Sequence, residues 1–549
     1  MSNYPEVHTR HDANCKPCLG PARSETLSMP GNLLHRSWEI SSTPVAVGAG
    51  GAEKVYGRNA AIDVDEKSET PVVPEKLLNN GFGPAEAVEG SGVAKGNADE
   101  SPASRTQSRI NVSMGLEGVR QRAREDKRAR FTSLLHHITP SLLVESFYAL
   151  RKNAAAGVDE VTWREYEGRL HSRVHGLHRE IHIGAYRALP SRRVYIPKAD
   201  GSKRPLGIAA IEDKIVQQAV ATVLGAIYEE DFLGFSYGFR PGRSQHQALD
   251  ALWVGIGRRK VGWILDADIC DFFGSIEHEW MERFLAHRIA DKRVLRLICN
   301  WLKAGTIEDG KRIAAEKGSP QGAVISPLLS NIYLHYVLDL WAHHWRRQQA
   351  VGDVILVRYA DDSVFGFEHE YEAKRFLAAM QERFARFGLK LHPDKTRLIE
   401  FGRWAALRRQ RRGLGKPETF DFLGFTHCCG KTRAGGFKIV RLTVRKRMRA
   451  TLQAIRDRLK RRMHEPVKVT GKWLGAVIRG YFNYHAVPDN LKRLNSFRKE
   501  VCRLWLKTIR RRSQRHRMTW ERFKHIVQRY LPNVRQQHPY PNKRFGVTT

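Results

Sequence analysis

Two adjacent aspartates, Asp361 and Asp362, lie within the strand-like stretch RYADDSVF, Arg358–Phe365. Asp is a common turn residue, so the simplest interpretation of the pair alone is the tip of a β-hairpin. The alternative is chemical, because neighbouring carboxylates can ligate a cation. Carboxylates and charges elsewhere in the chain decide between these two interpretations.

A second apolar stretch, WILDADICDFF, ends in three more carboxylates, Asp266, Asp268 and Asp271. Because side chains alternate along a strand, Asp266 and Asp268 should point the same way. The end of this strand and the tip of the hairpin could bring Asp268 close to Asp361 and Asp362. Clustered carboxylates repel one another unless a cation neutralises them. Oxygen ligands without His or Cys favour Mg²⁺, and two such ions are the standard device for displacement at phosphorus.

The charge of the chain indicates which phosphate compound such a site would use. The 549 residues carry a formal net charge of +36, and residues 437–549 hold 31 basic against 5 acidic side chains. Residues 1–100, in contrast, hold 9 basic against 14 acidic side chains. A field of this kind binds a polyanion through phosphate contacts and counterion release, which favours nucleic acid. An anionic membrane surface is the alternative, but we find no spanning-length apolar run and no signal-peptide pattern.

Periodicity predicts the elements that would position the carboxylates. Residues 1 to about 110 are rich in Gly, Ala, Ser, Pro and Glu and predict a disordered leader. Arg192–Ile208 predicts a strand, a turn and a returning strand, and Glu212–Tyr228 predicts an amphipathic helix. GFTHCCGKT, Gly424–Thr432, lacks the spacing of a phosphate-binding loop and is interpreted as a plain loop. Beyond about residue 437 the pattern is strongly helical and basic.

The seven cysteines follow no spacing typical of secreted proteins, so a reducing, cytoplasmic setting is expected. The motif CKPC, Cys15–Cys18, is one half of a zinc site without an obvious second half.

Three segments resemble core motifs of reverse transcriptases. They are DADICDFF at Asp266–Phe273, GSPQGAVISPLLSNIYL at Gly318–Leu334 and YADD at Tyr359–Asp362. More narrowly, the chain resembles bacterial group II intron-encoded proteins, which are reverse transcriptases with maturase activity. The segments AAAGVDEVTW, RRVYIPKADGSKRPLGI, YGFRPGRS, LHPDKTRLIEFGR and FDFLGF follow in that family's order. The resemblance runs from about Lys127 to the C-terminus.

This resemblance implies a right-hand polymerase fold of the α+β class. Its parts would be fingers, a palm with an antiparallel sheet, and a helical thumb joined to a basic helical maturase domain. The expected bounds are 1–110 for the leader, 111–255 for an N-terminal extension and fingers, 256–430 for the palm, and 437–549 for the thumb and maturase domain. No His-Asn-His nuclease motif with paired CxxC zinc spacing follows the basic region, so we expect no DNA endonuclease and primers that are already present, such as nicks or replication-fork ends.

The resemblance also implies roles for individual residues of the palm. Asp268, Asp361 and Asp362 would form the catalytic metal-binding triad, assisted by the Ile269 carbonyl. Phe273 would lie beneath the sugar and exclude a 2′-OH, which favours dNTPs as substrates. The alternative for Phe273 is an ordinary core aromatic residue.

Four further residues would contact the nucleotide. Gln321 lies in the SPQG segment, where Gly and Pro let the backbone approach closely. Lys198 and Arg204 flank the expected fingers turn and would clamp the triphosphate, although either could be a solvated strand charge. Lys395 matches a lysine common near the family's active site. The family often has FFD where this chain has FFG, with Gly274.

The C-terminal segment Gly480–Phe523 alternates aromatic and basic residues on helical spacing, which suits structured RNA. The alternative is a helical domain with a merely solvated basic face. By resemblance, this region grips the intron RNA and stabilises its spliceable fold. The candidate RNA-binding residues are Arg479, Tyr481, Arg510, Arg511, Arg512 and Arg515.

Other functions remain open from the sequence. One is a splicing-only RNA-binding factor with a vestigial polymerase, against which the intact Asp268, Asp361, Asp362 set argues. Another is a reverse transcriptase of a retron, a diversity-generating element or a CRISPR system, against which the long basic C-terminal region argues. A non-enzymatic, histone-like binder would account for the charge and for none of the motifs.

Overall fold

The computed structural model describes residues 115–197, 203–512 and 518–544. The expected leader, the Cys15–Cys18 motif, Lys198 and Arg515 therefore lie outside the described residues. Within these ranges, no helix has the length and apolar character needed to cross a membrane. The described cysteines are all free thiols.

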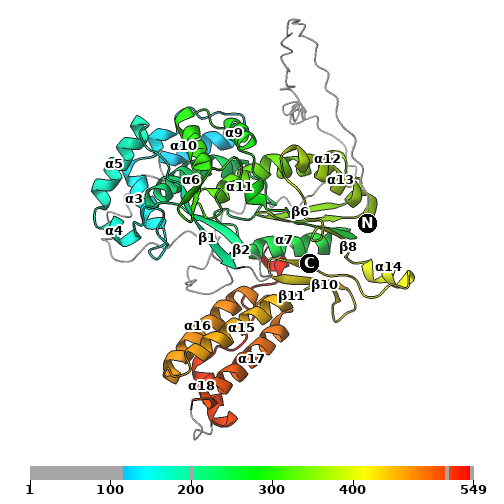
Figure 1. Cartoon of the computed structure of the whole chain (residues 1–549). Helices are drawn as coiled ribbons and strands as arrows, with labels where there is room; N and C mark the ends of the chain where they lie inside the picture. The colour runs from blue at the N-terminus through cyan, green and yellow to red at the C-terminus, as the bar shows by residue number, and fades with distance from the viewer. Residues whose placement is uncertain (1–114, 198–202, 513–517, 545–549) are drawn as a thin grey trace, which may run out of the picture. The chain divides into compact units, whose positions relative to one another are not determined.

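The palm sheet contains four antiparallel strands in the order β6-β7-β3-β8 (Figure 1). They are β3 (Trp263–Ala267), β6 (Val354–Tyr359), β7 (Asp362–Phe367) and β8 (Arg397–Glu400). Alternate residues enter two different hydrophobic cores, because side chains on a strand point to opposite faces. Leu265 and Phe365 pack on one face, whereas Ile264 and Val364 pack on the other. Both faces of the sheet are therefore covered.

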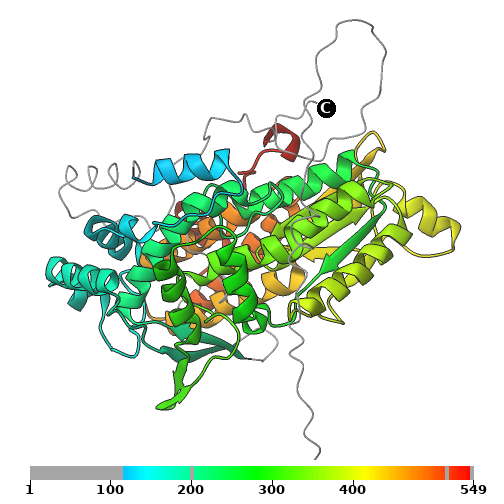
Figure 2. The same cartoon turned by 90° about the horizontal axis from the view of Figure 1, so that it is seen from above.

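Helices on the two faces supply those cores. Helix α13 (Glu370–Arg386) contacts β3 and β7, and α7 (Gln245–Arg258) contacts β6. Their green and yellow ribbons can be followed in both views (Figure 2). The other helices around the main core are α3 (Pro140–Ala149), α4 (Trp163–Glu167), α5 (Leu170–Ile183), α6 (Ile211–Asp231), α8 (Phe272–Ser275), α9 (His278–Ala286), α10 (Lys292–Lys303), α11 (Ser326–Leu334), the π-helix η3 (His335–Asp339) and α12 (Leu340–Gln348). The predicted helix at Glu212–Tyr228 is confirmed as part of α6.

A second sheet contains the predicted fingers hairpin. Its strands are β2 (Lys203–Ile208), β1 (Ser191–Pro197), β4 (Thr306–Glu308) and β5 (Lys311–Ile313), in that order. The antiparallel pairing of β1 with β2 confirms the hairpin predicted at Arg192–Ile208. Strand β4 pairs in parallel with β1. The strands of this sheet therefore come from both sides of residue 255, where the boundary between fingers and palm was expected. That boundary stays a prediction.

A third sheet corrects two sequence expectations. Its strands are β9 (Phe420–Phe422), β10 (Phe425–Lys431) and β11 (Phe437–Thr443). The segment Gly424–Thr432, interpreted as a loop, is mostly strand β10. The helical region begins at Arg445 and not at 437, because Ile439, Arg441 and Thr443 alternate as buried residues on β11. Arg441 masked this two-residue period, because a basic residue is not expected at a buried strand position.

The C-terminal helices form a bundle with its own core. They are α15 (Arg445–Arg461), α16 (Val467–His485), α17 (Leu491–Arg510) and α18 (Trp520–Tyr530), drawn in orange to red (Figure 1). Two glycines of α16 let α18 approach closely. A Cβ on Gly475 would lie 2.4 Å from the Tyr530 carbonyl oxygen, and one on Gly471 would lie 2.7 Å from the Tyr530 ring. Short elements elsewhere are η2 (Leu135–His137), α14 (Ala405–Arg411) and α19 (Pro541–Arg544). The predicted α+β class is confirmed.

Candidate active site

The adjacent aspartates lie at the tip of the β6–β7 hairpin, as one interpretation of the sequence predicted. Tyr359 pairs with Asp362, so only Ala360 and Asp361 form the turn. Ala360 has a φ of 56°. A positive φ lets a two-residue turn match the right-handed twist of the flanking strands, but it costs free energy for any residue except Gly. The turn thus projects Asp361 and starts β7 with Asp362.

Asp268 is brought to the same place by the register of β3 on β7. Ala267 pairs with Ser363, so the next residue, Asp268, lies level with Asp362. The two strands therefore place all three residues of the predicted triad within one acidic cluster. Asp266 is a fourth member, since its charge and that of Asp268 both act on Asp362.

The electrostatics of this cluster favour a bound cation. Loss of water around the carboxyl group raises the pKa of Asp362, although the residue stays exposed at the start of β7, and the negative charges of Asp361, Asp268 and Asp266 raise it further. Burial also raises the pKa of Asp266 to about 7; Arg397, 4.0 Å away, opposes this shift and the charge of Asp268 adds to it. Carboxylates that resist ionisation in this way are stabilised when a positive charge comes between them.

Lys395 already places one positive charge on the cluster. Its Nζ donates a hydrogen bond of 2.9 Å to Oδ2 of Asp268, and this bond raises the pKa of Lys395. The lysine comes from the segment before β8 and keeps 63% of its side chain exposed. It therefore contacts a triad carboxylate in this structure, and its predicted nucleotide contact stays a prediction.

The donor set suits a divalent ion, although the side chains do not converge on one. Among residues 115–197, 203–512 and 518–544, no group of three or more His, Cys, Asp or Glu side chains has metal-holding geometry. Carboxylate oxygens are nevertheless the ligands that hard divalent ions prefer. The mutual repulsion of Asp268, Asp361 and Asp362 is also what such an ion relieves. Reverse transcriptases use divalent metal ions.

A buried arginine fixes the turn from behind. Arg358 is 2% exposed and precedes the turn on β6. Its Nε donates to Oδ1 of Asp339 at 2.7 Å, and its Nη2 donates to Oγ of Ser236 at 2.7 Å. Its Nη1 donates to the carbonyl oxygen of Ala360 and to Oδ1 of Asn331, both at 2.9 Å. The guanidinium therefore holds the backbone of the Ala360–Asp361 turn to η3 and α11.

A glycine completes this support. Gly238 lies against the turn so closely that a Cβ there would be 2.2 Å from the amide nitrogen of Ala360. Nδ2 of Asn331 donates to the Gly238 carbonyl oxygen at 2.7 Å. Sequence reasoning missed this network. The available signals were an arginine inside the apolar strand Val354–Tyr359 and the YGFRPG segment.

Two of the predicted nucleotide contacts, Phe273 and Gln321, meet at the loop Gly318–Gly322. The amide of Ser319 donates to the Phe273 carbonyl oxygen at 2.8 Å. The amide of Gly207, on β2, donates to the Gln321 carbonyl oxygen at 2.7 Å. Gly322 has a φ of 104°, and a Cβ there would lie 3.0 Å from the Gly207 carbonyl oxygen. The loop thus joins Phe273 of the palm to the fingers strand.

Gly274, where the family often has Asp, lies against the side chain of Asp271. A Cβ on Gly274 would lie 2.2 Å from Oδ2 of Asp271, which itself has a φ of 38°. Phe273 is half-buried and packs on the main core, and Ile269 is 7% exposed. Arg204 lies on β2, opposite Ile196. The roles predicted for Ile269, Phe273 and Arg204 stay predictions.

The candidate RNA-binding residues lie in different environments. Arg479 is exposed on α16, and Arg510 and Arg511 are exposed at the end of α17. Arg512, next along the chain, is half-buried. The Tyr481 ring stacks on Phe497, with centroids 3.9 Å apart and planes 14° apart, so packing is the role that these contacts support. RNA binding by Tyr481 stays a prediction.

Comparison with known proteins agrees with this geometry. Residues 196–427 match the family described as reverse transcriptase (RNA-dependent DNA polymerase). Protein YkfC of Escherichia coli is 40% identical over 39% of this chain and 58% of its own length. The group II intron-encoded protein LtrA of Lactococcus lactis is 33% identical over 41% of this chain and 38% of its own length. A reverse transcriptase of the Mx162 retron of Myxococcus xanthus is 25% identical over 47% and 51%.

The chain thus spans less than two thirds of each of these relatives. The matched region contains both the acidic cluster and the loop Gly318–Gly322 that joins palm to fingers. The chain therefore contains a region that matches the reverse transcriptase family, and part of the chain is similar to a group II intron-encoded protein.

Proposed function

We propose that this protein is an RNA-directed DNA polymerase that binds group II intron RNA, assists its splicing and copies it into DNA. The observation that carries the polymerase part is the acidic cluster Asp268, Asp361 and Asp362, held by two paired strands inside the reverse transcriptase domain. The likeness to LtrA supports the intron part.

The residues of the palm would bind and orient the reactants. Asp268, Asp361 and Asp362 would hold two Mg²⁺, which when bound activate the primer hydroxyl and stabilise the leaving pyrophosphate. Phe273 would support the sugar of the incoming dNTP, and the backbone of the Gly318–Gly322 loop would approach its base pair. The fixed turn keeps Asp361 and Asp362 in place, so little reorganisation is needed when the primer end, the template and the dNTP arrive.

The triphosphate would be met by the basic residues of the fingers and by Lys395. Arg204 on β2, together with Lys198, would contact phosphate oxygens through charge-assisted hydrogen bonds. Lys395 bonds Asp268 in this structure and would turn to the nucleotide when a metal ion takes that carboxylate. The basic helices α15 to α18 would bind intron RNA through phosphate contacts.

The second candidate is a reverse transcriptase of another bacterial system. The likeness to the retron enzyme favours it, but at 25% identity this likeness is weaker than that to LtrA. A splicing-only factor is the third candidate, and the fixed acidic turn argues against it.

Primer extension on an RNA template tests the polymerase. We expect Asp361→Asn and Asp362→Asn to reduce DNA synthesis to background, because each removes a ligand charge without changing side-chain volume. Glu279→Gln on α9 is the control, since Glu279 is an exposed carboxylate outside both the acidic cluster and the basic helices, and it should retain full activity. RNA binding by all three variants, measured by filter retention, should match the unsubstituted protein. Equal loss of synthesis and RNA binding would disprove the separation of the two roles.

Sequencing of the RNA that co-purifies through a moderate-salt wash tests the intron partnership. A single dominant RNA that carries the sequence flanking this gene would support it. A short repeated noncoding RNA, or a mixture without preference, would leave the polymerase in place and remove the intron assignment.

A further inference from the structure

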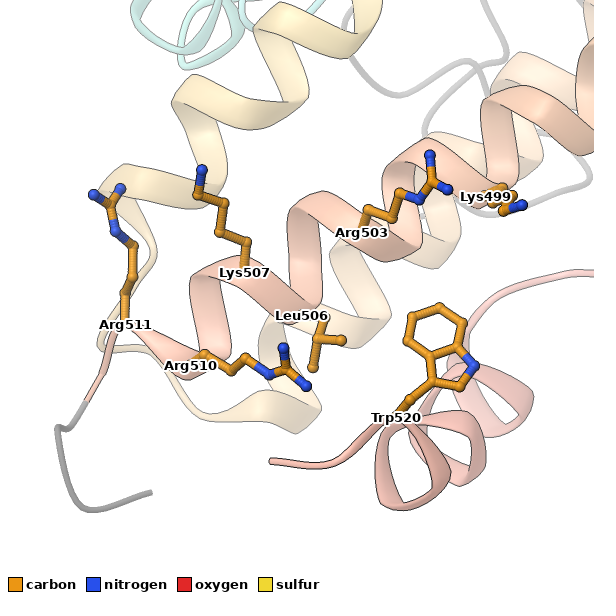
Figure 3. A pocket seen from close by; sticks show the side chains of 7 residues that line it. All are labelled: Lys499, Arg503, Leu506, Lys507, Arg510, Arg511 and Trp520. Atoms are coloured by element: carbon orange, nitrogen blue, oxygen red, sulfur yellow. The ribbon is translucent and has the colours of Figure 1, made fainter. Parts of the chain in front are cut away.

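The helical bundle contains a basic cavity with an exposed tryptophan. The cavity has a volume of about 670 Å³, within the range of roughly 300–1,000 Å³ that is typical of ligand sites. It opens between α17 and the start of α18 (Figure 3). Its lining residues are Lys499, Arg503, Leu506, Lys507, Arg510, Arg511 and Trp520. Five of the seven are cations, and none is a carboxylate.

The cations follow one side of α17. Lys499, Arg503 and Lys507 are spaced four residues apart, which places them about 6 Å apart along the helix axis. Arg503 pairs with Glu500, an exposed ion pair of small energy. Within the described part of the chain, Lys499 and Lys507 form no ion pair. The row therefore offers positive charge to an extended anion.

The tryptophan adds an apolar wall to this charged surface. Trp520 is the first residue of α18 and is 46% exposed, whereas Phe523, 5.8 Å away between ring centroids, is fully buried. Leu506 forms apolar lining beside it, and Figure 3 shows Arg510 and Leu506 directed toward the indole. Nε of Arg510 donates to the Met518 carbonyl oxygen at 2.9 Å, which ties the end of α17 to the segment that carries Trp520.

We propose that this cavity binds an unpaired nucleotide of RNA, with the base stacked on Trp520 and the adjoining phosphates on Lys499, Arg503 and Lys507. This proposal rests on the RNA-binding part of the proposed function and specifies the kind of RNA. An exposed aromatic ring next to a row of cations is the combination that binds single strands, because every base has a face that can stack. A base inside a duplex cannot present that face, so the site selects loops, bulges or ends.

An anionic membrane surface is disfavoured by the same residues. A single indole in a concave opening gives little apolar area to insert into lipid, whereas amphipathic membrane helices present a continuous apolar face. The opposite face of α17 is already buried, with Trp505 and Phe497 in the core of the bundle.

The test compares two exposed tryptophans. Trp520→Ala removes the proposed stacking surface, and Trp404→Ala removes a tryptophan that is 57% exposed before α14. One probe is a single-stranded oligoadenosine about 12 nucleotides long. The other is an RNA hairpin in which every base is paired except those of the linker that closes its loop. We expect Trp520→Ala to weaken binding of the single strand about 10-fold to 100-fold and binding of the hairpin less than about 3-fold. Trp404→Ala and Trp520→Phe should both bind the single strand nearly as the unsubstituted protein does.

A series of abasic oligonucleotides keeps the test independent of any folding defect. Removal of one base should weaken binding to the unsubstituted protein at one register of the strand and should leave binding to Trp520→Ala unchanged. Equal responses of both proteins would overturn the proposal. Tighter binding to anionic phosphatidylglycerol vesicles than to the single strand would also overturn it.

Failure of this site is distinguishable from failure of the proposed function. If the protein binds RNA and extends primers but Trp520→Ala behaves as Trp404→Ala does, only the nucleotide site is wrong. If the unsubstituted protein binds neither probe, the RNA-binding part of the proposed function fails with it.

Discussion

The Ala360–Asp361 turn and the basic side of α17 present two opposite ways to hold a charge. At the turn, Asp361 and Asp362 are fixed by a buried arginine, a glycine without room for a Cβ and a strained Ala360. Along α17, Lys499 and Lys507 are exposed side chains without such support. Chemistry at phosphorus requires atoms in set positions, whereas phosphate binding requires mainly the presence of charge.

This difference predicts how each region responds to substitution. Changes at the turn should be severe and all-or-none, because each supporting residue has partners that it would leave unpaired. Changes along α17 should be graded, because each cation contributes separately. The following experiments either break or sharpen this contrast.

The largest effect is expected when the buried arginine loses its charge. Arg358→Met leaves Asp339, which is fully buried, without its partner, so we expect a loss of about 3–5 kcal/mol in unfolding free energy. Chemical denaturation measures this loss. The double variant Arg358→Met, Asp339→Leu should recover much of the stability. It should remain poor in primer extension, because the Ala360 carbonyl oxygen is still unsupported. Full recovery of activity would show that the arginine serves stability alone.

Two glycine substitutions should change the free energy of unfolding in opposite directions, one at the turn and one in the C-terminal helical bundle. Gly238→Ala drives a Cβ into the backbone of Ala360 and should cost about 1–3 kcal/mol together with most of the polymerase activity. Gly480→Ala lies on an exposed position of α16 with no atom within 4 Å of the added Cβ, so it should stabilise by about 0.5–1 kcal/mol. Thermal unfolding and primer extension of both variants check this. A stable, active Gly238→Ala protein would contradict the close contact at the turn.

A smaller and graded effect is expected from the cations at the end of α17. Arg510→Gln with Arg511→Gln should reduce RNA affinity several-fold and lower the slope of log affinity against log salt by roughly 0.7 per lost phosphate contact. Titrations at several salt concentrations give this slope. Primer extension at saturating template should change little. An unchanged slope would refute the assignment of these arginines to phosphate contacts.

The smallest effect at neutral pH concerns His427 on β10, which is fully buried. Burial, aided by the charge of Arg441, lowers the pKa of His427 to about 3. Below about pH 6.5 the histidine of the unfolded chain binds a proton, whereas the buried histidine of the folded chain stays neutral. The contribution of the neutral histidine to the free energy of unfolding is therefore present above pH 6.5 and is lost as the pH falls toward 3. His427→Phe keeps an aromatic ring stacked on Phe420. It should reduce the pH-dependent loss of unfolding free energy by up to about 1.4 kcal/mol per pH unit. Denaturation at pH 7 and pH 5 measures it, and an unchanged pH dependence would exclude a buried neutral histidine.

The sequence predicted those features that depend on local pattern. The hairpin tip at Ala360–Asp361, strand β3 with its terminal carboxylate and helix α6 all follow from period and turn chemistry. The meeting of Asp268 with Asp362 was predicted from the motifs and follows from strand register. What could not be predicted depends on burial of polar groups, because sequence does not show that Arg358 lies inside and Lys395 outside.

The errors have the same physical origin. Strand β11 was assigned to the helical region, because Arg441 counts as a surface residue in any pattern but is buried here against Asp250. The stacking of the Tyr481 ring on Phe497 was also not predicted, and the RNA contact expected of Tyr481 stays a prediction. The cavity at Trp520 was also not predicted, since two separate helices form it.

The position of β3 at the centre of the palm sheet has a consequence for protein synthesis. Its neighbours, β7 and β8, are both encoded far downstream, and Asp268 meets Lys395 across 127 residues. At about 5–20 residues per second, a ribosome needs roughly 6–25 s to add that stretch. During this time both edges of β3 lack their hydrogen-bond partners. The acidic cluster should therefore be among the last parts of the palm to assemble. A nascent chain would therefore acquire metal-dependent activity only after β8 has emerged.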